Sequence, residues 1–318
     1  MTSKVSAMPA TRPVWRKWVS YGLFAVFAIW CALAFKKDIA QIDMAPMRDG
    51  WFMVLAAGAL SLLNYVLRIV RWQVYLRQLG VALPWQFVST TFMAGFAFTL
   101  SPGKLGEMVR ARYYVPLGIP MASVSGAFFV ERLLDLVVMI LLAVTVLSEL
   151  QVYQQFLWAS VILVVGALFV VAAVPWTRVA QAAERPDATR WTRWARPVAR
   201  MFASAKRFLS PSVLAMGLLL GAVAWGAEAV GLKLLCDVVK ADQISLAGAM
   251  GVYSIAIIVG ALSFLPGGLG STEVVMTGLL YAHGYPMPQA ILITLVCRLL
   301  TLWLAVVIGW LCVWSLRR

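Results

Sequence analysis

The sequence predicts an all-α polytopic membrane protein, with six full transmembrane helices and two re-entrant helical hairpins in two inverted repeats. The 318-residue chain is 62% hydrophobic and only 13% charged, a composition typical of proteins that cross the bilayer several times. Long apolar segments follow one another, and a Pro-Gly motif interrupts two shorter ones. Lysine and arginine give a formal net charge of +14, but they concentrate in the N-terminal tail and in one loop. That distribution is typical of the positive-inside rule.

The chain up to the basic loop supplies four expected spans and one hairpin. The first apolar run, 18–35, is interpreted as a span rather than a cleaved signal peptide, because it lacks a convincing small-residue cleavage site. Residues 51–147 form the first expected repeat, in which a re-entrant hairpin at 86–117 lies between two spans. A linking span at 152–174 and a basic loop at 176–211 follow.

The second half repeats this order. Residues 213–313 are expected to form a span, a re-entrant hairpin at 247–284 and a last span, so that residues 1–318 make one integral-membrane domain. In the first hairpin the apolar segment is shorter than the roughly 20 residues that a span needs. Loops rich in turn residues and charges have no partners in lipid. We therefore expect these loops to be wrapped in protein, to line a wet cavity or to lie at the surface.

The two hairpin motifs align with one another. SPGKLGEMVRARYY (101–114) and LPGGLGSTEVV (265–275) share Pro-Gly, Leu-Gly and a glutamate, with a two-residue insertion in the second copy. A Gly-x-Pro and an arginine recur downstream, and Asn64 falls on Glu228 upstream. Apolar stretches align easily by chance, but this ordered set indicates an internal repeat. The turn residues are Pro102, Gly103, Gly106, Pro266, Gly267, Gly268 and Gly270.

Charge also predicts the orientation. The positive-inside rule puts the N-terminus and the basic loop in the cytoplasm, and alternation of the spans then puts the C-terminus there too. The first repeat starts outside and the second inside, so the repeats are inverted, as in many transporters that bind substrate near the midplane. We expect the basic loop to lie on anionic lipid as an amphipathic helix rather than to bind nucleic acid.

Charged residues inside apolar segments are the candidate site, because intramembrane charge is rare and usually functional. In one interpretation the arginines hold a lipid phosphate, aided by backbone N–H groups at the turns. In the other, the same residues are ion pairs that fix hairpins to spans, for instance Glu107 with Arg132 and Glu273 with Arg298. Both can hold together. The candidates are Arg68, Arg71, Lys104, Glu107, Arg110, Arg112, Glu131, Arg132, Asp135, Glu228, Glu273 and Arg298.

Catalysis finds little support in the sequence. It contains no Ser-His-Asp set, no Walker motif and no metal-type spacing among its four cysteines and single histidine, His283. Glu131 and Asp135 lie four residues apart on one helix face, but without a histidine or metal site they do not indicate acid–base chemistry. We therefore predict that the protein is not an enzyme and uses no metal or cofactor.

Four motifs carry a family resemblance. RxxRWxxxLRxLG (68–80), PGKLGE, GAFFVERLLDL (126–136) and PGGLGSTE together resemble the lysylphosphatidylglycerol synthase transmembrane family, over residues from about Arg68 to Trp310. That family includes the flippase half of the bifunctional synthase/flippase and free-standing bacterial and archaeal membrane proteins, some associated with hopanoid or glycolipid pathways. The chain ends at Arg318 without the soluble transferase domain, so the resemblance implies a free-standing translocating module.

The expected function is therefore movement of a polar or phosphate-bearing lipid between the leaflets of a bacterial inner membrane. The alternative is a non-transporting scaffold that presents a phospholipid, hopanoid or polyprenyl-linked lipid to a biosynthetic partner. The sequence does not specify the lipid, the direction or the coupling ion, and it leaves a homo-oligomer open.

Overall fold

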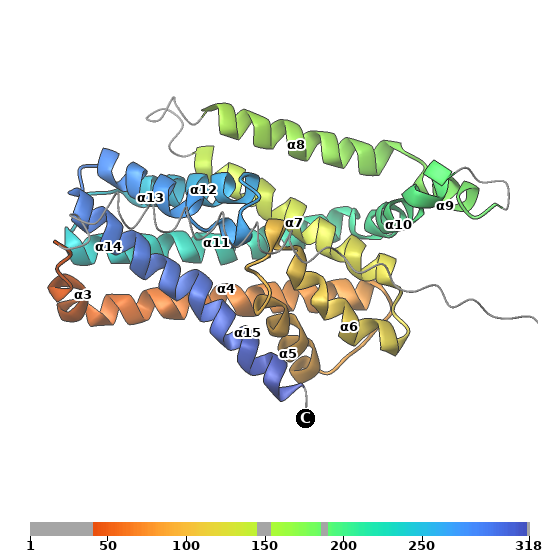
Figure 1. Ribbon diagram of the computed structural model, residues 1–318, viewed down its shortest axis with the longest axis horizontal. Coiled ribbons are helices and arrows are strands. Elements are labelled where there is room, and N and C mark those ends of the chain that lie inside the picture. The colour runs from red at the N-terminus through yellow and green to blue at the C-terminus, as the bar shows by residue number, and fades with distance from the viewer. Residues whose placement is uncertain (1–40, 145–153, 186–189, 317–318) are drawn as a thin grey trace, which may run out of the picture. The chain divides into compact units, whose positions relative to one another are not determined.

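Two long helices, α4 (Trp51–Gln78) and α11 (Pro211–Val239), pack against each other through the main unit of the chain (Figure 1). The computed structural model describes residues 41–144, 154–185 and 190–316, and every regular element in them is helical. From Ile42 onward these residues form a single unit. The expected first span, 18–35, lies outside the described residues.

Three contacts show that α4 and α11 run antiparallel. Gly50, just before α4, lies against Val238 near the end of α11. In the middle, Ser61 Oγ donates a 2.9 Å hydrogen bond to Glu228 Oε2. Further along α4, Arg71 donates to the carbonyl of Gly217, near the start of α11, at 3.4 Å. Residue numbers thus rise along one helix as they fall along the other.

Each long helix is followed by two shorter arms joined at a Pro-Gly turn and then by another long helix. The first set packs α5 against η1, and the second packs α12 against both η6 and α13. The two turns η1 and η6 also contact each other, α5 packs against α15, and α12 packs against α7. The elements are α5 (Trp85–Phe96), η1 (Pro102–Arg110), α6 (Ala111–Tyr114), η2 (Val115–Leu117), α7 (Met121–Ala143), α12 (Leu246–Leu262), η6 (Pro266–Gly268), α13 (Ser271–Ala282), α14 (Met287–Arg298), η7 (Leu299–Trp303) and α15 (Leu304–Ser315).

The sequence predicts a helical break at each Pro-Gly motif, and both breaks are present. In the first, the chain does not continue as an α-helix directly after Pro-Gly. The chain is instead a 3₁₀-helix over Pro102–Arg110, followed by a single α-helical turn. In the second turn Gly267 and Gly270 adopt φ of +62° and +85°, in the left-handed region where side chains are strained.

The segment between the two repeats is helical as well. The linking helix α8 (Gln154–Ala173) lies within the span expected over 152–174. It is followed by α9 (Trp176–Ala182), whose axis is bent by 65° from that of α8. Residue 175, between them, is a proline, which interrupts helical hydrogen bonding. The basic loop then folds into α10 (Arg190–Ala205) and η5 (Lys206–Phe208), with α3 (Ala45–Asp49) preceding α4.

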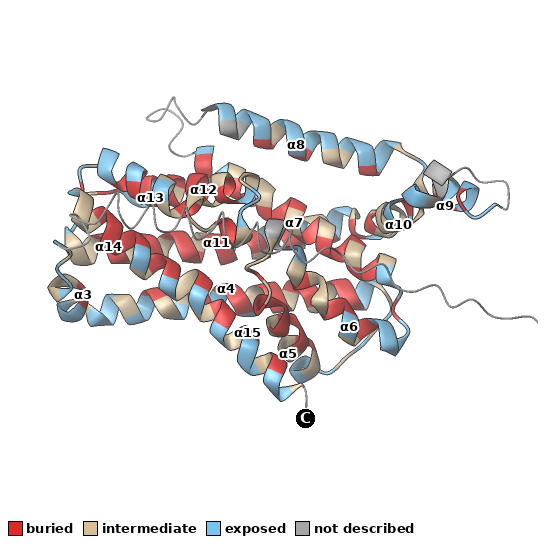
Figure 2. Ribbon diagram, in the orientation of Figure 1, coloured by how far each residue is buried: buried red, intermediate tan, exposed pale blue. Residues whose placement is uncertain are grey.

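Three helices in the described residues are long and apolar enough to cross a membrane: α4, α11 and the continuous stretch Met287–Ser315. The bent pair α8–α9 makes a fourth if it is one span. Many residues of α8 are exposed, as Figure 2 shows, and these include Trp158, Ile162 and Phe169. Helix α7 is also largely apolar, but three charged residues, Glu131, Arg132 and Asp135, lie near its middle.

Candidate functional site

A buried network of charged side chains joins α4, η1 and α7. Among the described residues it contains four arginines and three carboxylates. All but one of the side chains are at least nine-tenths buried, the exception being Arg132 at 21% exposed. The members are Arg68, Arg71, Glu107, Arg110, Glu131, Arg132 and Asp135. We call this set the charged cluster.

Glu131 lies at the centre of the charged cluster. Its carboxylate is 2.9 Å from Arg132 Nη2 and 3.2 Å from Arg110 Nη1. It also lies 3.4 Å from Arg68 and 3.6 Å from Arg71, each measured to Nη2. One carboxylate thus pairs with an arginine from each of the three elements. A buried carboxylate requires such partners, because desolvation strongly disfavours an unpaired charge.

The other two carboxylates fix the edges of the cluster. Asp135 Oδ1 accepts a 2.6 Å hydrogen bond from Arg71 Nη2 and a 3.0 Å hydrogen bond from Trp225 Nε1 of α11. Glu107 accepts a 2.8 Å hydrogen bond from Thr99, and its Oε2 is 3.7 Å from Arg132 Nη2. The charged cluster therefore ties the first hairpin to α4, α7 and, through the indole, α11.

Aromatic rings surround the arginines. The guanidinium carbon of Arg110 lies 4.3 Å from the ring centroid of Trp72 and 4.6 Å from that of Phe92. Arg68 lies 5.2 Å from the Phe96 ring and 5.6 Å from Trp225. Cation–π contact stabilises a guanidinium that has lost its water, and it does so without neutralising the charge. The arginines of the charged cluster therefore stay charged although they are buried.

The second repeat contributes an ion pair of its own. Arg298 Nε lies 2.6 Å from Glu273 Oε1, and Arg298 Nη2 donates to the carbonyl of Gly267 at 2.9 Å. The other oxygen of Glu273 accepts from the backbone N–H of Gly270 at 2.6 Å, which caps the start of α13. The two ion pairs expected from the sequence, Glu107 with Arg132 and Glu273 with Arg298, are thus confirmed.

A small cavity of about 50 Å³ lies between the two halves. Arg68 and Glu107 line it from the first repeat, and Glu228 and Arg298 line it from the second. Hydroxyl and amide groups complete its polar lining. These are Asn64, Tyr65, Thr99, Tyr253 and Thr301. A volume of this size holds only a water or two, at about 30 Å³ each, so the cavity is closed to a lipid head group in this conformation.

A family comparison covers both the charged cluster and this central cavity. The model of the lysylphosphatidylglycerol synthase TM region matches residues 18–309. The chain belongs to this family. Membership agrees with the apolar helices of the structure, and the protein is a multi-pass membrane protein.

Similar proteins are also found in archaea. A UPF0104 membrane protein of Methanothermobacter thermautotrophicus is 26% identical over 294 residues, which cover 85% of each chain. A second from that organism is 25% identical and covers 85% of this chain and 87% of its own. A UPF0104 membrane protein of Pyrococcus horikoshii is 23% identical over 303 residues, or 83% and 87% of the two chains. The chain thus spans most of the length of each relative.

The structure brings most of the candidate residues predicted from the sequence together and separates the others. Seven form the charged cluster, while Glu228, Glu273 and Arg298 belong to the second half. Arg112 was expected with them but is exposed on α6, on a turn whose buried residues are Ala111 and Tyr114. The side chain of Lys104 lies outside the described part of the structure.

Several residues at the site were missed from the sequence. Ser61, Tyr65 and Trp225 hydrogen-bond at the interface of the two halves, to Glu228, the carbonyl of Thr301 and Asp135. Ser61 had a signal. It shares one face of α4 with Asn64, Arg68 and Arg71, at helical spacings of three and four. No feature of the sequence distinguished Tyr65 and Trp225, because aromatic residues are common in the core and at the interfaces of apolar segments.

Proposed function

We propose that this protein moves a phosphate-bearing lipid between membrane leaflets, with the head group passing through the central cavity. The observation that carries the proposal is the charged cluster. Its arginines lie beside a cavity where two broken helices meet. Arginine binds phosphate oxygens through paired N–H donors, so a lipid phosphate would replace the carboxylates as the partner of these arginines.

We further propose six spans and two re-entrant hairpins arranged as inverted repeats. Both halves have the same order of elements: a long helix, a short arm, a Pro-Gly turn, a second arm and a long helix. The two leading helices, α4 and α11, are antiparallel. Their packing is reciprocal, since α5 contacts α15 as α12 contacts α7, and η1 contacts η6. Reciprocal contacts of this kind are typical of a two-fold relation.

The proposed mechanism uses the hairpin turns as gates. The turns η1 and η6 contact each other, and Glu107 of η1 lines the cavity. Gly267 of η6 approaches Leu100 so closely that an added Cβ would stand 2.7 Å from its Cδ2. Separation of one hairpin from the bundle would open the cavity to one leaflet, and separation of the other would open it to the opposite leaflet. The arginines would exchange carboxylate partners for the lipid phosphate. This role involves no catalytic step, and we place the protein in a bacterial inner membrane with both termini cytoplasmic.

A second function is favoured by the size of the cavity. About 50 Å³ is too small for a head group, and the charged cluster is bonded throughout three elements. A scaffold that presents a lipid to a partner enzyme would need this rigidity and no open path. The two functions differ in one property, which is the transfer of lipid across the bilayer.

A leaflet-exchange assay separates them. Purified protein is reconstituted in vesicles with a fluorescent phospholipid, and a membrane-impermeant reductant bleaches label as it reaches the outer leaflet. The proposal predicts bleaching of inner-leaflet label, lost in Arg68→Lys, which keeps the charge but removes the forked donors. Arg178→Lys, at an exposed position on α9, serves as the matched control. If the inner-leaflet label stays unbleached with folded wild-type protein, the transport proposal fails and the scaffold function remains.

A further inference from the structure

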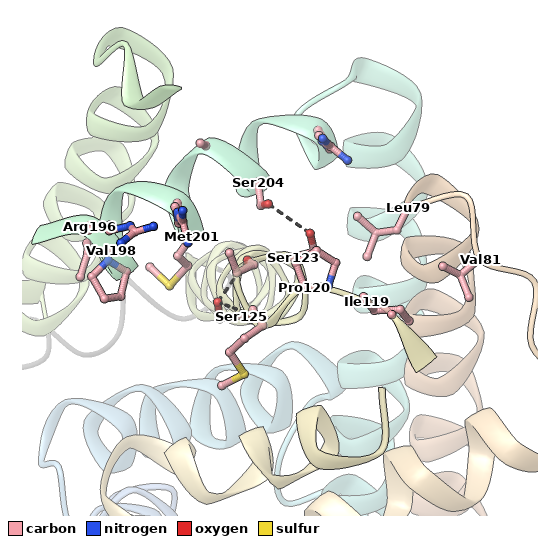
Figure 3. A pocket seen from close by; sticks show the side chains of 17 residues that line it. Leu79, Val81, Ile119, Pro120, Ser123, Ser125, Arg196, Val198, Met201 and Ser204 are labelled. Atoms are coloured by element: carbon pink, nitrogen blue, oxygen red, sulfur yellow. Dashed lines mark hydrogen bonds between the residues drawn. The ribbon is translucent and has the colours of Figure 1, made fainter. Parts of the chain in front are cut away.

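A second, larger pocket lies away from the charged cluster. It is a groove of about 890 Å³ between α10, the start of α7 and the end of α4 (Figure 3). Leu79, Ile119 and Met201 are among its apolar lining residues, and Arg196, Arg200 and Arg207 bring positive charge to it. The volume is within the range of about 300–1,000 Å³ that is usual for small-molecule sites. We call it the α10 groove.

Close packing fixes α10 as one wall of the groove. A Cβ added to Gly126 of α7 would stand 2.8 Å from the carbonyl oxygen of Met201 and 2.9 Å from the N of Ala205. The hydroxyls of Ser123 and Ser204 lie 3.3 Å apart across the same contact, as Figure 3 shows. The groove is thus bounded by two helices in backbone contact, and its arginines are held on a packed element.

The charge of the α10 groove is positive. Arg196 and Arg200 both pair with one carboxylate, Glu184, and their side chains remain 43% and 45% exposed. The hydrogen bond from Arg200 lowers the pKa of Glu184 below its ordinary value, so this carboxylate stays ionised at neutral pH. Arg207 is exposed and adds a third cation. The groove therefore combines an apolar lining with more arginines than carboxylates.

Helix geometry gives the depth of the groove. Leu79 lies eight residues beyond Arg71 on α4 and its C-cap, and Ser123 lies eight residues before Glu131 on α7. Eight residues correspond to about 12 Å along a helix. The hydrocarbon core extends about 15 Å from its midplane. If the charged cluster lies at the midplane, as the proposed function has it, the α10 groove lies near the level where acyl chains meet phosphates.

We propose that the α10 groove is a binding site for an anionic phospholipid of the surrounding leaflet. Its phosphate pairs with Arg196, Arg200 and Arg207, and an acyl chain lies along the apolar lining. The site is separate from the central cavity, and its lipid is resident rather than transported. Only the membrane level of the groove rests on the proposed function, and the test below measures binding alone.

The test titrates delipidated, detergent-solubilised protein with phosphatidylglycerol or phosphatidylcholine and counts bound lipids by native mass spectrometry. The groove variant Arg196→Gln/Arg200→Gln/Arg207→Gln is compared with Arg77→Gln/Arg178→Gln/Arg185→Gln, which removes the same charge from exposed positions outside the groove. Loss of a charge-assisted hydrogen bond weakens binding about tenfold or more. We expect that loss for phosphatidylglycerol in the groove variant alone. Equal loss in both variants would show general surface attraction and would overturn the proposal.

A second pair of variants tests the apolar part. Ala203→Trp places an indole in the groove, whereas Ala195→Trp adds one at an exposed position of α10 outside it. We expect weaker phosphatidylglycerol binding only for Ala203→Trp. Displacement of the lipid by millimolar inorganic phosphate would instead identify a free-anion site, and a dimer that Ala203→Trp dissociates would identify a second copy as the occupant. Either result contradicts the proposal. None of these positions belongs to the charged cluster, so leaflet exchange is assayed separately.

Discussion

Glu131 is the residue on which the charged cluster depends, because it lies within 3.6 Å of all four arginines. Glu131→Gln leaves four buried cations with two carboxylates. Breaking a buried ion pair from one side costs about 3–5 kcal/mol. We predict a large fall in the melting temperature of the detergent-solubilised protein. Glu184→Gln, at an exposed ion pair, should leave it unchanged. An unchanged melting temperature for Glu131→Gln would show that water or other groups compensate inside the cluster.

The two homologous ion pairs should respond differently to double substitution. Glu273 and Arg298 contact each other at 2.6 Å outside the charged cluster, so removing both should be milder than removing either. Glu107 also lies 3.5 Å from Arg110 and 3.8 Å from Arg68, so Glu107→Ala/Arg132→Ala should regain only part of the stability lost in Glu107→Ala. Melting temperatures of the single and double alanine variants measure both cycles. A fully additive Glu273/Arg298 cycle would show that this pair adds no net stability.

At the residue scale, the sequence predicts single ion pairs better than it predicts which of them come together in one cluster. Glu107 with Arg132 and Glu273 with Arg298 could be predicted, because each buried charge requires a partner and the repeat supplied the same two types twice. Convergence of four arginines could not be predicted, since helical spacing identifies a shared face but not the element that packs on it. The prediction that Arg112 belongs to the site was wrong for the same reason. Its neighbour Arg110 points inward, and Arg112 is exposed.

Among the elements, the contact of α7 with α10 is the one most sensitive to a single atom. Gly126→Leu should push α10 away, because the added Cβ would meet backbone atoms at 2.8 and 2.9 Å. We predict faster amide hydrogen exchange in α10 and weaker disulfide formation between Ser123→Cys and Ser204→Cys in the same chain. Gly278→Leu is the control, since nothing lies within 4 Å of a Cβ there. Undiminished crosslinking in Gly126→Leu would show that the contact between α7 and α10 accommodates the larger side chain, and would contradict this prediction.

Element boundaries could be predicted in part. Apolar length and the Pro-Gly motifs predicted α4, α11 and the two helical breaks, because backbone groups in an apolar segment must bond within a helix. The bend after α8 was missed, although Pro175 in the sequence is a sufficient physical reason for it. The 3₁₀ form of η1 was also missed. Tertiary contact decides it, since a Cβ at Gly106 would meet the carbonyl oxygen of Phe98 at 2.4 Å.

For the whole molecule, the orientation of the two ends of α11 is testable. This helix contains 29 residues, about 43 Å at 1.5 Å each, which exceeds the hydrocarbon thickness. Trp194, 82% exposed on α10, precedes it, and the exposed Asp242 follows it. We predict that Trp194→Cys and Asp242→Cys label from opposite sides of intact cells, with Asp242→Cys labelled from outside. Labelling of both from one side would remove the inverted-repeat arrangement.

The contact between the two Pro-Gly turns is the feature of the whole molecule on which the proposed transport depends. A bulky substitution such as Gly267→Leu is a poor test, because φ of +62° and the 2.7 Å approach to Leu100 would strain the fold itself. A reversible lock supplies its own control. Gly267→Cys keeps the strain at φ of +62°, but Leu100→Cys removes the Cδ2 atom that the new Cβ would meet, and the reduced double variant shows whether the protein still folds. The Cα of Leu100 lies 3.8 Å from a Cβ built on Gly267, close enough for a disulfide to form between cysteines at the two positions.

Leaflet exchange by Leu100→Cys/Gly267→Cys, in a background without the native cysteines, therefore tests the transport mechanism most directly. If the turns must part for the head group to pass, the oxidised protein moves no lipid and reduction restores the rate, which also shows that the locked protein was folded. Exchange by fully crosslinked protein at the rate of the reduced protein would contradict the account, because lipid would then cross without separation of the hairpins.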